Sequence, residues 1–67
     1  MYTFKIFIAT KLVAIIETND MTELKEISPY DYARNILELY RSDLVNCQCF
    51  LNGEFDFSVN KRMYGIK

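Results

Sequence analysis

Two carboxylates and two cysteines lie in one short stretch of this chain, and their spacing gives them the most potential for chemistry. Glu54 and Asp56 are two residues apart, so on a regular strand they share one face, about 7 Å from each other. Such a pair can serve as general acid and general base. A shallow exposed strand, however, cannot desolvate a carboxyl group enough to tune its pKa. We therefore expect both to be surface groups.

The residue inventory excludes most other catalytic arrangements. The chain has no histidine, which removes the commonest general base and the Ser-His and Cys-His pairs. Gly53 and Gly65 are its only glycines, so it has no Gly-rich phosphate-binding loop. We expect no catalytic residue, no cofactor and no enzyme activity.

Cys47 and Cys49 form the one pair of soft metal ligands. A structural zinc site needs four ligands, so only a dimer that shares four thiolates could build one here. A disulfide between two residues this close on one strand is geometrically poor. The favoured interpretation is that both are small core residues without a metal.

Charge is unevenly distributed along the chain. Residues 1–59 carry five Lys or Arg against nine Asp or Glu, whereas residues 60–67 carry Lys61, Arg62 and Lys67 and no acid. This basic tail, which also holds Tyr64, could bind phosphates or an acidic protein, and it could be loosely ordered. A nucleic-acid binder typically has basic residues over the body of the domain, so nucleic acid is the alternative rather than the leading partner.

The elements that would position these groups begin with two apolar runs. Residues 2–8 alternate, with Tyr2 and Phe4 on one face and Lys5 and Phe7 on the other, which predicts a strand. Residues 12–16 form a second apolar run after a short spacer, which favours a hairpin although the spacer lacks Gly or Asn. A helix over 9–18 is the competing interpretation. The polar residues 17–27 are predicted to be mainly a solvated connection.

Helix signals follow this connection. Ser28 is a good N-cap, Pro29 fits the first helical position, and the charge of Asp31 favours the first turn. The apolar residues that follow at helical spacing, one buried face, are Ala33, Ile36, Leu37 and Tyr40. We expect this helix to end near residues 42–43.

A second hairpin is predicted over residues 45–59 with its turn at Asn52-Gly53. A two-residue turn would pair Cys49 with Asp56 and mix apolar with acidic side chains on one face. A three-residue loop over 51–53, with Gly53 left-handed, instead pairs Cys49 with Phe55 and separates the two kinds of side chain. We therefore predict the three-residue loop.

These elements predict an α+β fold of order β-β-α-β-β, with one helix packed on a mainly antiparallel four-stranded sheet. The 67 residues are expected to be a single domain, 1–67. No segment has the roughly 20 apolar residues of a membrane span, and the start of the chain lacks the features of a signal peptide. We expect a cytoplasmic protein without membrane contact.

Binding is the remaining class of function. Phe50 is the large apolar side chain on the polar face of the predicted hairpin, and an aromatic anchor with a polar rim is typical of an interface centre. We predict a partner-binding site of Phe50, Glu54 and Asp56, joined by Arg62 and Tyr64 from the tail. The strand edges could also pair with a second copy or with a target.

In layout and composition the chain resembles small accessory proteins of bacteriophages. It is acidic and Gly-poor, and its strand-helix-hairpin order is similar to that of a phage-encoded antitoxin against a ribonuclease toxin. The resemblance, which extends to anti-CRISPR and other anti-defence proteins, implies an inhibitor that binds a host or defence protein in the host cytoplasm. The alternative hypothesis is a small nucleic-acid-binding module that uses the basic tail and exposed aromatic residues.

Overall fold

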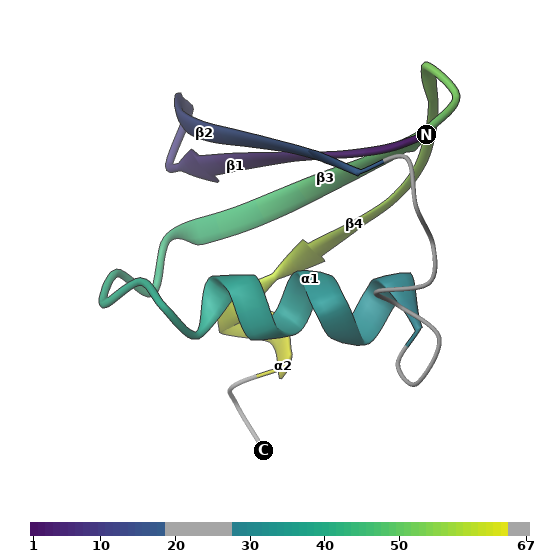
Figure 1. The fold of residues 1–67 in the computed structure, drawn as a ribbon. Coiled ribbons are helices and arrows are strands. Elements are labelled where there is room, and N and C mark those ends of the chain that lie inside the picture. Colours follow the sequence, from purple (N-terminus) through teal and green to yellow (C-terminus); the bar gives the residue numbers. More distant parts are fainter. Residues whose placement is uncertain (19–27, 65–67) are drawn as a thin grey trace.

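The sheet that dominates the fold is formed by two hairpins (Figure 1). The structure is a computed structural model that describes residues 1–18 and 28–64. Residues 19–27 of the predicted connection and residues 65–67 of the predicted tail lie outside the described residues. The elements, in chain order, are β1 (Tyr2–Ile8), β2 (Lys11–Thr18), α1 (Pro29–Leu37), β3 (Val45–Leu51), β4 (Glu54–Asn60) and α2 (Lys61–Tyr64).

The four strands lie in the order β2-β1-β3-β4, and every neighbouring pair is antiparallel. The central contact therefore joins β1 to β3, strands from different hairpins. Helix α1 packs against β3 and β4 on one face of the sheet. This arrangement confirms the predicted α+β fold with one helix on an antiparallel four-stranded sheet. The short helix α2 is an addition to it.

The first hairpin turns at Ala9-Thr10, and its second strand excludes the competing helix over 9–18. Ala9 has a φ of 56°, a left-handed conformation in which glycine is normally favoured. Its amide donates a hydrogen bond to the Leu44 carbonyl, 3.1 Å away. Near the turn, Val13 is an extra residue in β2, because Ile6 pairs with Ala14 and Phe7 pairs with Leu12.

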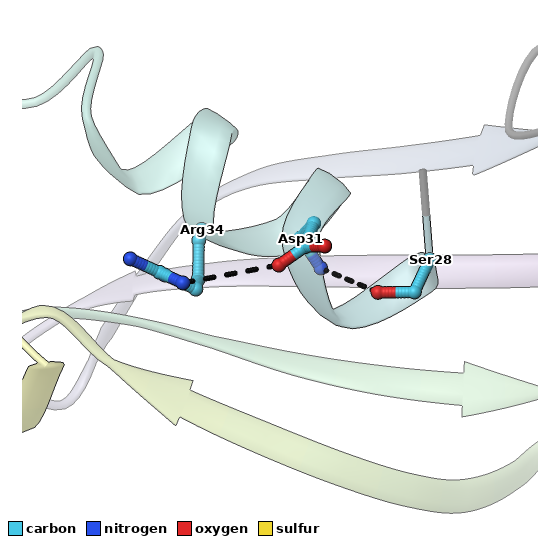
Figure 2. Close-up of polar contacts among 3 residues, drawn as sticks. All are labelled: Ser28, Asp31 and Arg34. Atoms are coloured by element: carbon cyan, nitrogen blue, oxygen red, sulfur yellow. Dashed lines mark hydrogen bonds and ion pairs between the residues drawn. The ribbon is translucent and has the colours of Figure 1, made fainter. Parts of the chain in front are cut away.

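Helix α1 begins as predicted. The Ser28 hydroxyl accepts a hydrogen bond from the Asp31 amide at 3.1 Å, with Pro29 directly after the cap. Asp31 in turn lies 3.8 Å from the Arg34 guanidinium, one turn further on (Figure 2). The cap satisfies one of the amides that a helix start leaves without an intrahelical partner.

The end of α1 differs from the prediction, because the helix stops at Leu37 rather than near residues 42–43. The amides of Leu39 and Tyr40 bond to carbonyls three residues earlier, which tightens the last turn. The Ser42 hydroxyl then accepts the Leu44 amide at 3.0 Å. Such local side-chain bonds compete with helix continuation, and the chain turns into β3 instead.

The core lies between α1 and the sheet. Its members are buried apolar residues from α1 and from β1, β3 and β4: Phe4, Ile6, Ala33, Ile36, Leu37, Val45, Cys47, Cys49 and Val59. Both cysteines have no exposed side-chain surface, which confirms their prediction as core residues. Tyr32 of α1 packs its ring on Phe4 at 5.1 Å.

The second hairpin turns at Asn52-Gly53, but the predicted three-residue loop is wrong. Leu51 pairs with Glu54 across a two-residue turn, in which Asn52 has a φ of 53° and Gly53 of 87°. Left-handed residues at both positions match the twist of the flanking strands. A two-residue turn was expected to mix apolar and acidic side chains on one face. This mixing is avoided because Asp56, two residues into β4, is bulged out of the pairing.

The bulge changes which side chains face the core. Phe50 pairs with Phe55, whereas Cys49 pairs with Phe57 rather than with Phe55 as predicted. Phe57 thus packs against the core, while Phe55 is 60% exposed. The hairpin therefore carries two aromatic rings on its outer face, where the sequence predicted Phe50 alone.

The first residues of the predicted basic tail form α2. The Asn60 side chain accepts a hydrogen bond from the Arg62 amide at 2.9 Å, and the Lys61 ammonium donates to the Tyr40 carbonyl. The second of these contacts joins the end of β4 to the chain that follows α1. Over the described ranges, every helix is too short or too polar to cross a bilayer.

Candidate protein-binding surface

The sheet has a second face, opposite α1, which we call the open face. Because side chains alternate along a strand, the residues between the buried ones of β1 and β3 point to it, and the pairings extend it to β2 and β4. Neither described helix lies on this side (Figure 1). Its three rows across the sheet, from the Asn52-Gly53 turn onward, are Glu17, Thr3, Phe50 and Phe55, then Ile15, Lys5, Gln48 and Ser58, then Leu12, Phe7, Asn46 and Asn60.

One corner of the open face is an aromatic corner, which we define as Phe50, Phe55 and Lys5. The two rings are 5.8 Å apart in an edge-to-face arrangement, a favoured geometry for aromatic pairs. The Lys5 ammonium lies 4.8 Å from the centroid of the Phe50 ring, within range of a cation–π interaction. Phe50 is half-buried by these neighbours, whereas Phe55 remains exposed.

The diagonally opposite corner is the apolar corner, which we define as Leu12, Ile15 and Phe7. Ile15 is 52% exposed and Leu12 is 43% exposed, while Phe7 is half-buried. Leu12 pairs with Phe7 across the β1–β2 ladder. Ile15 pairs with Lys5, so the two corners adjoin in the middle row, whereas Thr3 and Gln48 are the polar neighbours of Lys5 and Phe50.

The five predicted binding residues are only partly brought together. Phe50 lies on the open face, and the exposed residues Glu54 and Asp56 flank Phe55 in the chain. Glu54 pairs with Leu51, so strand alternation assigns it to the opposite face from Phe50. Arg62 is exposed on α2, at the other end of β4, roughly 20 Å along the strand from Glu54. Tyr64 lies in α2, and its side chain is outside the described part of the chain.

Several residues of the surface were missed by sequence reasoning. Phe55 was assigned to the core, and Lys5 was not connected with Phe50 because the pairing of β1 with β3 is long-range. The residues of β2 did carry a signal. This strand is apolar on both sides yet contributes no buried residue, and a continuous apolar run is typical of strands covered on both faces.

The two thiols are shielded from solvent. Burial raises the pKa of Cys47 to about 12, with a further rise from the neighbouring Cys49. Burial also raises the pKa of Cys49 to about 11, and the Asp56 carboxylate adds to it. Both side chains are therefore protonated at neutral pH, whereas zinc binds the thiolate. Sharing them with a second chain, as the dimer-zinc hypothesis requires, would need the core to open.

Metal-ligating side chains are also dispersed elsewhere. Within residues 1–18 and 28–64, no three His, Cys, Asp or Glu side chains cluster closely enough to hold a metal ion.

No protein family model matches the sequence, and no curated protein or solved structure matches the chain.

Proposed function

We propose that this protein is a non-catalytic binding protein that attaches to another protein through the open face of its sheet. The observation that carries the proposal is the set of exposed apolar side chains on that face, with Phe55, Ile15 and Leu12 between 43% and 60% exposed. Exposed apolar patches with polar groups around them mark interaction sites. Aromatic residues are enriched at the centre of such interfaces.

The aromatic corner is suited to be an anchor. Phe50 is held between the Phe55 ring and the Lys5 ammonium, so little side-chain entropy remains to be lost when a partner covers it. Gln48 and Thr3 on the same face supply polar groups for a surrounding rim. This arrangement supports the part of the predicted site that contains Phe50.

We further propose that binding inhibits the target. A chain with no histidine and with its carboxylates Glu54 and Asp56 on an exposed edge strand acts by occupying a surface of its target. Together with the resemblance to small phage accessory proteins, this supports an inhibitor of a host or defence protein, of the anti-CRISPR or antitoxin kind, in the host cytoplasm.

The nucleic-acid hypothesis has less support from the geometry. Lys61 donates to the Tyr40 carbonyl, so its ammonium group is engaged within the fold. The open face itself carries one cation, Lys5, and one anion, Glu17. Binding to phosphates relies on clusters of basic side chains, which this face does not present.

Capture of a partner with matched surface variants tests the proposal. Phe55→Ser and Ile15→Ser remove exposed apolar groups from the open face, whereas Leu39→Ser removes one that is 82% exposed just beyond α1. We expect the unmodified protein and Leu39→Ser to retain the same partner from a host lysate. The affinity of the two open-face variants for this partner should fall by at least roughly tenfold, since anchors carry most of the binding energy.

Unfolding curves of each variant establish that the loss is not a loss of folding. Equal retention by all four proteins would contradict the open face as the binding surface. Inhibition is tested separately, by titrating the purified partner and measuring its activity. A partner that binds at stoichiometric amounts with unchanged activity would rule inhibition out.

A further inference from the structure

The end of the sheet with the Asn52-Gly53 turn holds three carboxylates and the Met1 ammonium, which donates to the Asn52 side chain. The other end holds two basic side chains and the exposed acid Asp43. The pairings of Thr3 with Glu17 and of Leu51 with Glu54 place these acids at the end that carries the Asn52-Gly53 turn, and Asp56 lies in the bulge nearby. The basic residues Lys11 and Arg62 lie at the opposite end, beside the β1–β2 turn and after β4.

The two ends are far enough apart to act separately on a charged partner. Strand β4 runs from Glu54 to Asn60, which corresponds to roughly 20 Å. The Debye length at physiological ionic strength is about 8 Å. The basic end is therefore screened from the turn, where the Met1 ammonium and Lys5 offset part of the charge of the three carboxylates.

The aromatic corner lies at the acidic end. Phe50 and Phe55 occupy the same row as Glu17, and Glu54 and Asp56 flank Phe55 directly in the chain. The Lys5 ammonium already lies over the Phe50 ring, in the geometry of a cation–π contact. The exposed Phe55 ring offers a second aromatic surface, next to the bulged Asp56 in the chain, while Glu54 points to the other face of the strand.

We propose that the aromatic corner and its carboxylates bind a basic, arginine-bearing segment of the partner protein, an inference that rests on the proposed function. Arginine fits this chemistry because its planar guanidinium stacks on aromatic rings and bonds carboxylates in a forked geometry. A nucleic acid would bring its phosphates against Glu17, Glu54 and Asp56. A second copy could bring its basic end only head to tail, and a head-to-tail contact that does not close by rotation produces filaments.

A pair of short peptides tests this inference on the full-length chain. The probe is Ac-Gly-Arg-Leu-Arg-Gly-NH2, and its control replaces both arginines by citrulline, which is neutral and nearly isosteric. In a titration of isotope-labelled protein followed by NMR, we expect the arginine peptide to shift the amides of Phe50, Phe55 and Asp56. The affinity for the citrulline peptide should be lower by at least about fivefold, because this peptide lacks the charge.

Charge-neutral variants sharpen the assignment. Glu54→Gln and Asp56→Asn should each weaken the arginine peptide by about two- to fivefold. Asp43→Asn removes an exposed acid at the other end of the sheet, next to Leu44, and should leave the affinity unchanged. Unfolding curves verify that each variant remains folded.

The inference is overturned if citrulline binds as well as arginine, if no shifts occur at the turn end, or if Asp43→Asn has the same effect as Asp56→Asn. It also fails if a single-stranded oligonucleotide, or an increase in protein concentration alone, produces the expected shifts. If capture of the natural partner depends on Phe55 but not on Glu54 or Asp56, the proposed function stands. The inference that the partner presents a basic segment is then wrong. If capture is unaffected by Phe55→Ser, the proposed function fails instead.

Discussion

Phe50 and Phe55 face each other across the second hairpin with their ring centroids 5.8 Å apart, and this contact depends on one unpaired residue. Asp56 is bulged out of the ladder, so Phe55 points to the open face while Phe57, two residues later, packs against the core. In a regular strand the two phenylalanines would lie on the same side. The bulge thus creates the aromatic corner.

The contrast between these phenylalanines gives the first prediction. Phe57→Ala should lower the free energy of unfolding by about 2–3 kcal/mol, because it leaves a cavity beside Cys49 and removes the contact with Tyr30 at 5.7 Å. Phe55→Ala should lower it by about 1 kcal/mol, mainly through the lost aromatic pair. Urea unfolding of both variants measures the difference, and a larger loss for Phe55→Ala would contradict the bulge at Asp56.

Features determined by neighbouring residues were predictable from the sequence. Ser28 and Pro29 mark the start of α1 because a cap and a fixed φ act within one turn. The alternation of residues 2–8 sufficed for β1, and the small apolar character of Cys47 and Cys49 sufficed to assign them to the core. In each case a local periodicity or a local hydrogen bond decides the outcome.

The register of the second hairpin was not predictable in the same way. A three-residue loop and a two-residue turn followed by a bulge both place Val59 on the core side, and they differ chiefly in the position of Phe55. The requirement that apolar side chains point to the core therefore does not distinguish the two registers. The matching twist of left-handed Asn52 and Gly53 favours the tighter turn, and the extra residue is absorbed at Asp56.

The candidate site depends even more on long-range contacts. Lys5 reaches Phe50 only because β1 lies beside β3, and no pattern within either strand specifies that neighbour. Ile15 reaches the open face through its pairing with Lys5. The predicted site consequently contained residues near in the chain, such as Glu54 and Asp56, and omitted those brought in by the sheet order.

The strained turn of the first hairpin gives the second prediction. Ala9 has a φ of 56°, which costs an L-residue about 1–2 kcal/mol. Ala9→Gly should raise the free energy of unfolding by up to about 1 kcal/mol, since glycine relieves the strain but adds entropy to the unfolded chain. Thermal or urea unfolding measures this change.

The reverse substitution, at Gly53, is the control for Ala9→Gly, because it introduces a Cβ at a left-handed position. Its φ is 87°, and a Cβ built there meets no atom within 4 Å, so Gly53→Ala tests the backbone conformation without a clash. We expect a loss of about 1 kcal/mol. If Ala9→Gly destabilises the protein, or if Gly53→Ala has no effect, the two turns are not the left-handed turns of the structure.

The buried thiols give a dependence of stability on pH. The pKa of Cys47 is about 12 and that of Cys49 about 11 in the folded protein, against an ordinary value near 9.0. Below pH 9 both states hold these protons, so the thiols cause no pH dependence. Above pH 9 the unfolded chain releases them first. Stability should then fall by about 1.4 kcal/mol per pH unit for each thiol until the folded pKa is reached.

A double variant isolates this effect from the titration of tyrosines and lysines. Cys47→Ala with Cys49→Ala removes both thiols, so its free energy of unfolding should decline less steeply between pH 9 and pH 11. The slopes are compared by urea unfolding at each pH, because the absolute stability also changes when core volume is lost. Identical slopes for the two proteins would show that the thiols are exposed in the folded state.

The contact of Lys61 with the Tyr40 carbonyl gives the last prediction. Lys61 is half-buried at the start of α2, and its ammonium joins the end of β4 to the segment after α1. Lys61→Met keeps most of the apolar stem but removes the donor, so the free energy of unfolding should fall by about 1–2 kcal/mol. Arg62→Met removes the neighbouring charge, which is exposed, and should change it by less than about 0.5 kcal/mol. Equal effects in urea unfolding would mean that the basic residues act only through their charge and that α2 is not fastened by Lys61.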